Sequence, residues 1–228
     1  MGSAALGVVV EVLDEGALYR LLRVRRPDKA ATAATLAAHR APGQFVQVDA
    51  GGDQTLFALA DAPGAADDAL ELLVKRGGAV ADALFSLVPG DAVAMSDPEG
   101  AGYPLELARG LDLVLVAAGS GIAPIRAALV GALRRRDDFG RIALFYGQAR
   151  PEDFAFADEV DGWRRGGVFV TLCATAAGSD WPGVRGRVQA ALAVDAPAWD
   201  PTRTAVFVCG MAAMEDEVRA LAERRGVP

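Results

Sequence analysis

Cysteine and histidine are scarce in this chain, which limits the chemistry it can perform. Two cysteines, Cys173 and Cys209, are too few for a disulfide framework and fit a reducing compartment. The only histidine is His39, which we expect on a surface loop with no functional role. One histidine and two distant cysteines do not form a set typical of a metal site, so we predict no metal centre.

Basic residues and long apolar runs are also lacking. The 23 Lys and Arg residues are outnumbered by 30 Asp and Glu residues, which gives a net charge of −7. Because contacts to nucleic-acid phosphates need a basic surface, this balance argues against a nucleic-acid partner. No run approaches the roughly 20 apolar residues that span a bilayer, and no transit peptide is visible.

The pattern of hydrophobic residues divides the chain into two parts. Its 228 residues suffice for one large or two small domains. Short alternating runs give way to strand–helix repeats near residue 109. We therefore predict two domains: an antiparallel β-barrel over residues 1–108 and an α/β domain with a parallel sheet over residues 109–228.

The first part contains six runs typical of short strands. They cover residues 8–13, 18–24, 44–48, 56–60, 70–75 and 91–96. A short helix is expected between residues 80 and 87. Residues 30–38 are rich in Ala and Thr, and the pattern leaves a short helix and an ordered loop as alternatives.

The second part alternates buried strands with helices. Aliphatic strands are expected at residues 113–116, 142–146, 168–172 and 205–208, and helices at about 123–136, 153–165, 186–193 and 211–225. This alternation predicts a parallel sheet with helices on both faces. Ligands of such sheets bind at the carboxyl ends of the strands.

A small-residue turn, Gly119-Ser120-Gly121, follows the first of these strands and precedes a helix. Glycines allow a sharp turn and a close approach of a ligand, and the N–H groups at a helix N-terminus suit a pyrophosphate. The turn lacks the third glycine of the Rossmann fingerprint. By itself it is therefore consistent with either a nucleotide site or a structural tight turn.

Three segments of the second part together resemble the ferredoxin–NADP reductase superfamily. They are GSGIAP at residues 119–124, LFYGQARPED at 144–153 and VFVCGMAAM at 206–214. In the first part, PGQFV at 42–46, LVPGD at 87–91 and GAGYPL at 100–105 resemble further segments of that superfamily. Within it, the chain is most similar to the plastid reductase-like proteins of plants and algae, which implies a chloroplast location; the alternative is the cytoplasm.

The resemblance implies that the barrel binds FAD. The residues expected to hold it are Phe57, Ala58, Leu59, Ala60, Val74, Lys75, Gly78, Ala79, Val80 and Ala81. The flavin motif of the superfamily, R-x-Y-[ST], is depleted, because Thr55-Leu56-Phe57-Ala58 stands in its place. Only the aromatic residue is kept, and Ala81 replaces a Ser or Thr that would contact phosphate. Main-chain amides would then carry much of the binding, and the alternative is that Phe57 is only a core aromatic.

The resemblance places NAD(P) on the second part. The expected contacts are Gly119, Ser120, Gly121, Ile122, Ala123, Pro124, Tyr146, Gly147, Arg150, Arg187, Gly210, Met211 and Met214. Arg150 and Arg187 would bind a 2′-phosphate, which favours NADPH over NADH, unless both are only exposed surface charges. Cys209 would lie beside nicotinamide C4 as the catalytic residue; the alternative is a buried structural cysteine.

These expectations describe an FAD-dependent NAD(P)H oxidoreductase that passes electrons to an acceptor. The sequence does not name the acceptor, which could be a ferredoxin-like protein or a quinone. The alternative is a non-catalytic member of the same fold that has lost its flavin and binds nucleotide or acts as a scaffold. Electron transfer through an iron–sulfur cluster of this chain is disfavoured, because the necessary group of cysteines is absent.

Overall fold

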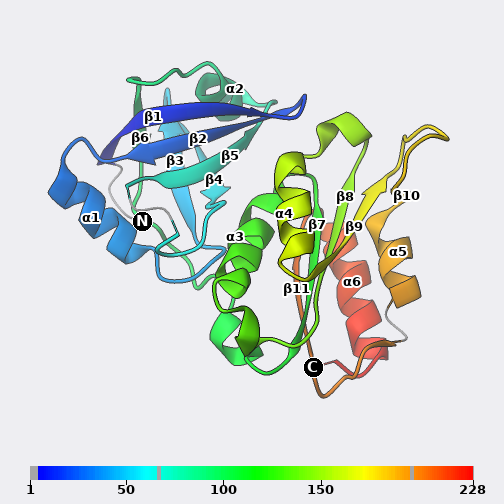
Figure 1. The fold of residues 1–228 in the computed structure, drawn as a ribbon. Helices are drawn as coiled ribbons and strands as arrows, with labels where there is room; N and C mark the ends of the chain where they lie inside the picture. Colours follow the sequence, from blue (N-terminus) through cyan, green and yellow to red (C-terminus); the bar gives the residue numbers. More distant parts are fainter. Residues whose placement is uncertain (1–4, 66–67, 196–197, 228) are drawn as a thin grey trace.

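The chain forms one antiparallel and one parallel sheet, which lie side by side in the computed structural model (Figure 1). The structure describes residues 5–65, 68–195 and 198–227. Both predicted sheet types are confirmed, and they follow one another along the chain in the predicted order.

The first sheet is an antiparallel barrel whose strands follow the order β4-β3-β6-β1-β2-β5. Its strands are β1 (Ala5–Glu15), β2 (Tyr19–Arg25), β3 (Phe45–Ala50), β4 (Asp53–Ala58), β5 (Leu70–Lys75) and β6 (Ala92–Met95). An isolated bridge between Leu59 and Leu72 joins the chain after β4 to β5, the strand at the other edge, and so closes the barrel. The six predicted strands are thus confirmed.

Two helices accompany the barrel, α1 (Lys29–Ala38) and α2 (Ala79–Phe85). The Ala- and Thr-rich segment is therefore a helix rather than a loop. The carboxylate of Asp28 starts it by accepting a hydrogen bond from the N–H of Ala31 at 2.8 Å.

The second sheet is parallel, with the strand order β10-β9-β8-β7-β11. Its strands are β7 (Asp112–Ala118), β8 (Ile142–Gln148), β9 (Val168–Ala174), β10 (Val184–Arg185) and β11 (Thr204–Cys209). The helices are α3 (Ile122–Leu133), α4 (Val160–Arg165), α5 (Val188–Asp195) and α6 (Ala212–Arg224). The two-residue edge strand β10 was not predicted.

The helix predicted over residues 153–165 is wrong in its first half. Residues 151–153 and 157–159 form separate 3₁₀ turns, and α4 begins only at Val160. Phe156 lies between the turns with a φ of 58°, a left-handed conformation that an α-helix cannot contain.

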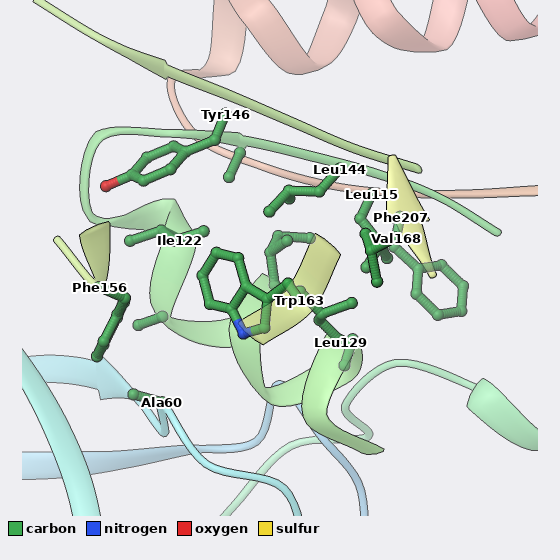
Figure 2. Packing of buried hydrophobic residues seen from close by; sticks show 14 of the residues in the cluster. Ala60, Leu115, Ile122, Leu129, Leu144, Tyr146, Phe156, Trp163, Val168 and Phe207 are labelled. Carbon is green, nitrogen blue, oxygen red and sulfur yellow. The ribbon is translucent and has the colours of Figure 1, made fainter. Parts of the chain in front are cut away.

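A single hydrophobic core joins the barrel to the sheet. Helices α3 and α4 cover the face of the parallel sheet on the barrel side, while α5 and α6 cover the other face (Figure 1). Tyr19, Leu73 and Ala60 of the barrel pack in one buried cluster with β7, β8 and α3. Figure 2 shows Ala60 beside Phe156 at the edge of this cluster. The barrel and sheet are therefore held by shared apolar burial, not only by the chain that links them.

His39 is buried rather than on the surface, which corrects the prediction for this residue. Only 6% of it is exposed, since the chain between α1 and β3 folds against the barrel. Burial lowers the pKa of its imidazole to about 4, because the charged form loses its hydration. His39 is therefore neutral at physiological pH.

Asp61 gives the seam between barrel and sheet a specific pH dependence. It is 8% exposed, and burial together with the nearby Glu71 raises the pKa of its carboxyl to about 6. The folded protein thus binds this proton more tightly than the unfolded chain does. The stability contributed by protonated Asp61 is complete below the ordinary pKa of 3.8 and is lost as the pH rises through 6.

We predict that Asp61→Asn raises the free energy of unfolding at pH 8 by about 1–3 kcal/mol and changes it little at pH 4. Urea unfolding at pH 4, 5, 6 and 8 measures this difference. Asp53→Asn, at the exposed start of β4, is the control and should show no such trend. Equal pH profiles for the two variants would contradict the assignment.

Candidate functional site

The small-residue turn after β7 is shaped by contact with β11. Gly119 has a φ of +60°, which favours glycine. A Cβ atom on Gly121 would lie 2.3 Å from the carbonyl oxygen of Cys209, closer than any side chain can approach. Gly119 is therefore required by the backbone conformation, and Gly121 by the lack of space for a side chain.

The N–H groups of this turn are only partly free. The N–H of Ile122 bonds to the carbonyls of Gly119 and Ser120. It is therefore not free to bind a ligand, although the sequence predicts a contact between Ile122 and NAD(P). The side chains of Ile122, Ala123 and Pro124 are buried and fix the start of α3. Within the turn, Ser120 is exposed and Gly119 half-buried, whereas Gly121 is buried.

A cavity of about 560 Å³ lies between the end of α3 and the segments around Pro42, Pro63 and Pro104. Another cavity, of about 460 Å³, opens where the parallel strands end. The second is the candidate site, because the carboxyl ends of β7, β8 and β9 meet there, as predicted. Of the predicted residues it is lined by Lys75, Gly119, Gly147, Arg187, Met211 and Met214. Sequence reasoning missed Gln148, Thr175, Gln189 and Glu217, which also line it.

The two candidate arginines are placed differently. Arg187 lines the cavity, in the turn before α5. Arg150 is exposed at the start of the 3₁₀ turn over Pro151–Asp153 and is not among the residues that line the cavity. The structure therefore brings Arg187, but not Arg150, together with the Gly119 turn.

Tyr146 supports the site from behind. It is fully buried, and its hydroxyl accepts hydrogen bonds from Gln148 Nε2 at 2.7 Å and from the N–H of Ala155 at 3.2 Å. Gln148 also bonds to the hydroxyl of Tyr19, a residue of the barrel. The side chain of Tyr146 thus orients Gln148 and does not itself open into the cavity. Gln148 could have been found from its position at the end of β8.

Cys209 ends β11 as a partly buried, neutral thiol. Burial, followed by the negative charge of Glu215, raises its pKa above the usual value. Its neighbour Tyr103 donates a hydrogen bond to the carbonyl of Val208 at 3.0 Å. The raised pKa disfavours a nucleophilic thiolate and fits a small side chain that leaves room for a ligand.

Beyond Cys209, the chain turns tightly into α6. The N–H of Gly210 donates to Glu215 Oε1 at 2.9 Å. Met214 is 2% exposed and packs over Gly210, whereas Met211 is 69% exposed. This segment gives the cavity an apolar wall on the α6 side.

The expected flavin-ring segment is more closed than the sequence implied. Phe57 is 9% exposed and packs in the barrel core, while Leu56 on the opposite side of β4 is 57% exposed. The N–H groups of Leu59 and Ala60 bond to the carbonyls of Gln44 and Glu71. Any contact from residues 58–60 would therefore use other main-chain atoms. Val74 is fully buried.

The expected phosphate segment, in contrast, is open. Gly77 and Gly78 have φ values of +119° and +94°, and nothing lies within 4 Å of where their Cβ atoms would be. The N–H groups of Ala79, Val80 and Ala81 form the first turn of α2 and have no partners within it. Lys75 is exposed nearby. These residues fit the diphosphate of FAD, and the ring contact of Phe57 stays a prediction.

Comparison with known proteins finds a family match in the second part of the chain. Residues 115–220 match the family described as "Oxidoreductase NAD-binding domain". In the part of the chain that the structure describes, no helix is long and apolar enough to cross a membrane.

Two curated relatives extend the similarity into the barrel. Over 173 residues the chain is 31% identical to the sulfhydrogenase 1 subunit gamma of Pyrococcus furiosus, covering 74% of this chain and 58% of the relative. Over 196 residues it is 35% identical to the ferredoxin–NAD(+) reductase component of the alkene monooxygenase system of Xanthobacter autotrophicus, covering 82% and 58%. The chain thus spans less than two thirds of each.

A solved structure shows the same fold over nearly the whole chain. The ferredoxin NADP+ reductase of Neisseria gonorrhoeae, with bound FAD and NADP, superimposes with a TM-score of 0.80. The alignment covers 99% of this chain and 93% of the other, at 19% identity. The relatives come from archaea and bacteria, so the expected closeness to plastid proteins and the chloroplast location are not supported.

Gly121→Ala should damage the site far more than Gly119→Ala. The added methyl at position 121 collides with the main chain of β11, while at position 119 it meets only the left-handed conformation, which costs about 1–2 kcal/mol. We predict that Gly121→Ala loses at least about 2 kcal/mol more in urea unfolding. It should also weaken NADPH binding, measured by calorimetry, more than Gly119→Ala does. Equal losses would show that the turn does not pack as described.

Proposed function

We propose that this chain is a ferredoxin reductase-like oxidoreductase, an NAD(P)H-dependent flavoprotein; the family match and the similarity to named reductases support this. The observation that carries the proposal is the cavity at the carboxyl ends of the parallel strands, because Lys75 of the barrel and the Gly119 turn of the sheet both line it. A nucleotide bound there would lie directly against the barrel. Residues 1–108 would bind FAD and residues 109–228 NAD(P).

FAD, when bound, supplies the redox chemistry by taking a hydride from the reduced nucleotide and passing electrons to an acceptor. The residues of this chain would bind the two cofactors and orient them toward each other. The main chain of Gly119 and Ser120 would hold the nucleotide diphosphate, and the Gly78–Ala81 turn that of FAD. The neutral thiol of Cys209 would leave room beside the nicotinamide. This assignment requires no side-chain acid or base.

The acceptor is proposed only by class. The relative from Xanthobacter is named as a ferredoxin–NAD(+) reductase component, so a small ferredoxin-like protein is the first candidate to test. A quinone is the second.

We propose NADPH as the preferred nucleotide, because Arg187 lines the cavity and a guanidinium binds a 2′-phosphate bidentately. Arg187→Gln should raise the KM for NADPH about 10–100-fold, since a charge-assisted bond is lost. The KM for NADH should change less than about threefold, because NADH has no phosphate at that position. Arg150→Gln is the matched control and should leave both values unchanged. A wild-type preference for NADH would contradict the proposal.

The alternative, a flavin-free member of the fold, is favoured by the buried position of Phe57 and by the paired N–H groups of Leu59 and Ala60. Incubation with FAD followed by gel filtration distinguishes the flavoenzyme from the flavin-free alternative. The enzyme should retain about one FAD per chain, with absorbance bands at about 375 and 455 nm. A protein that stays colourless with excess FAD supports the alternative.

A further inference from the structure

Arg126 extends from the parallel-sheet domain into the barrel and is almost completely buried. It lies in the first half of α3, shortly after the Gly119–Gly121 turn, and its side chain is 11% exposed. Its Nη1 donates to the carbonyl of Ala60 and to Glu71 Oε2, both at 2.7 Å. One guanidinium thus holds two separate segments of the barrel.

The other two nitrogens of Arg126 also have a partner. Nε and Nη2 bond to the carboxylate of Glu159, with an Nη2–Oε1 distance of 2.7 Å. The guanidinium lies 4.4 Å from the centre of the Phe156 ring. Burial alone would lower the pKa of Arg126, but the carboxylates of Glu159 and Glu71 outweigh it and raise the pKa. Arg126 is therefore a permanent cation with a partner at each of its three nitrogens.

The two barrel segments that Arg126 binds are also bonded to each other. The N–H of Ala60 donates to the main-chain carbonyl of Glu71 at 2.9 Å, so Ala60, Glu71 and Arg126 form a closed network. Ala60 ends the segment expected to face the flavin ring, and Figure 2 shows it against the core under α3. Gly121, which directly precedes α3, packs on the carbonyl of Cys209. Helix α3 therefore links the Arg126 network to the nucleotide turn.

From this geometry we infer that Arg126 is a positioning residue that fixes the distance between the flavin-ring segment at Ala60 and the nucleotide turn at Gly119–Gly121. The inference rests on the proposed function, because that function requires the two cofactors to meet. Arg126 is not itself among the residues expected to contact FAD or NAD(P), and both main-chain polar groups of Ala60 are taken by the network. Arg126 acts through the carbonyl of Ala60 and through the start of α3.

A displacement of about 1 Å between reacting groups slows a reaction about 100-fold. Arg126→Met removes every polar contact, and Arg126→Lys keeps the charge but loses the planar fork. We expect both variants to bind FAD and NADPH within about threefold of wild type. The rate of flavin bleaching at saturating NADPH, followed anaerobically by stopped flow, should fall at least about 30-fold.

Hydrogen exchange gives a readout that needs no flavin. The amide of Ala60 should exchange at least about tenfold faster in both variants, because the carbonyl of the same residue loses its donor. Arg134→Met is the matched control: Arg134 stands at the end of α3 and is exposed, and its side chain donates one hydrogen bond across the seam, to the carbonyl of Pro63. It should change neither quantity by more than about twofold.

Wild-type bleaching rates, or unchanged Ala60 exchange, in Arg126→Lys would overturn the inference. Should Arg126→Met fail to fold, Arg126→Lys and Glu71→Gln carry the same test, because each removes only part of the network. If the wild-type chain takes up no FAD, the proposed function fails, while the exchange of Ala60 still decides whether Arg126 holds the segment.

Discussion

The structure depends on apolar burial that the barrel and the parallel sheet share. Tyr19 and Leu73 of the barrel are nearly unexposed because they pack against α3 and the sheet rather than against solvent. Fully burying one such side chain contributes about 1.5–3 kcal/mol. Within this apolar seam, the ion pair of Arg126 with Glu71 is largely shielded from water, while Glu159 on the other side of the guanidinium is partly exposed. The two halves of the proposed site therefore have a fixed relation.

The site itself is made largely of main chain, and few of its side chains are charged or reactive. Gly119, Gly121, Gly77 and Gly78 create exposed or closely packed backbone where the chain turns. Charged side chains at the cavity are few, namely Lys75, Arg187 and Glu217 among its lining residues. Such a site would bind nucleotides through its shape and through hydrogen bonds from main-chain amides, and it would rely on a bound cofactor for the reaction.

Much of the fold could be predicted from periodicity. Short alternating runs form strands with one buried face, whereas continuous aliphatic runs form strands that are buried on both faces. The site was predictable where a residue acts through its backbone, as at Gly119. It was not predictable where tertiary packing decides. The helix expected from residue 153 was interrupted by the left-handed Phe156, and His39 was buried by a loop. Arg126 acquires its role from partners that the chain brings together from both halves, the carbonyl of Ala60 in the barrel and the carboxylate of Glu159 near the start of α4.

In the proposed enzyme, a nicotinamide and a flavin ring would meet at the seam between barrel and sheet. Anaerobic titration of the FAD-loaded protein with NADP+ after partial reduction tests it most directly. Rings in contact predict a broad charge-transfer band beyond about 520 nm that saturates with the nucleotide. A spectrum equal to the sum of its components at saturating nucleotide would contradict the account.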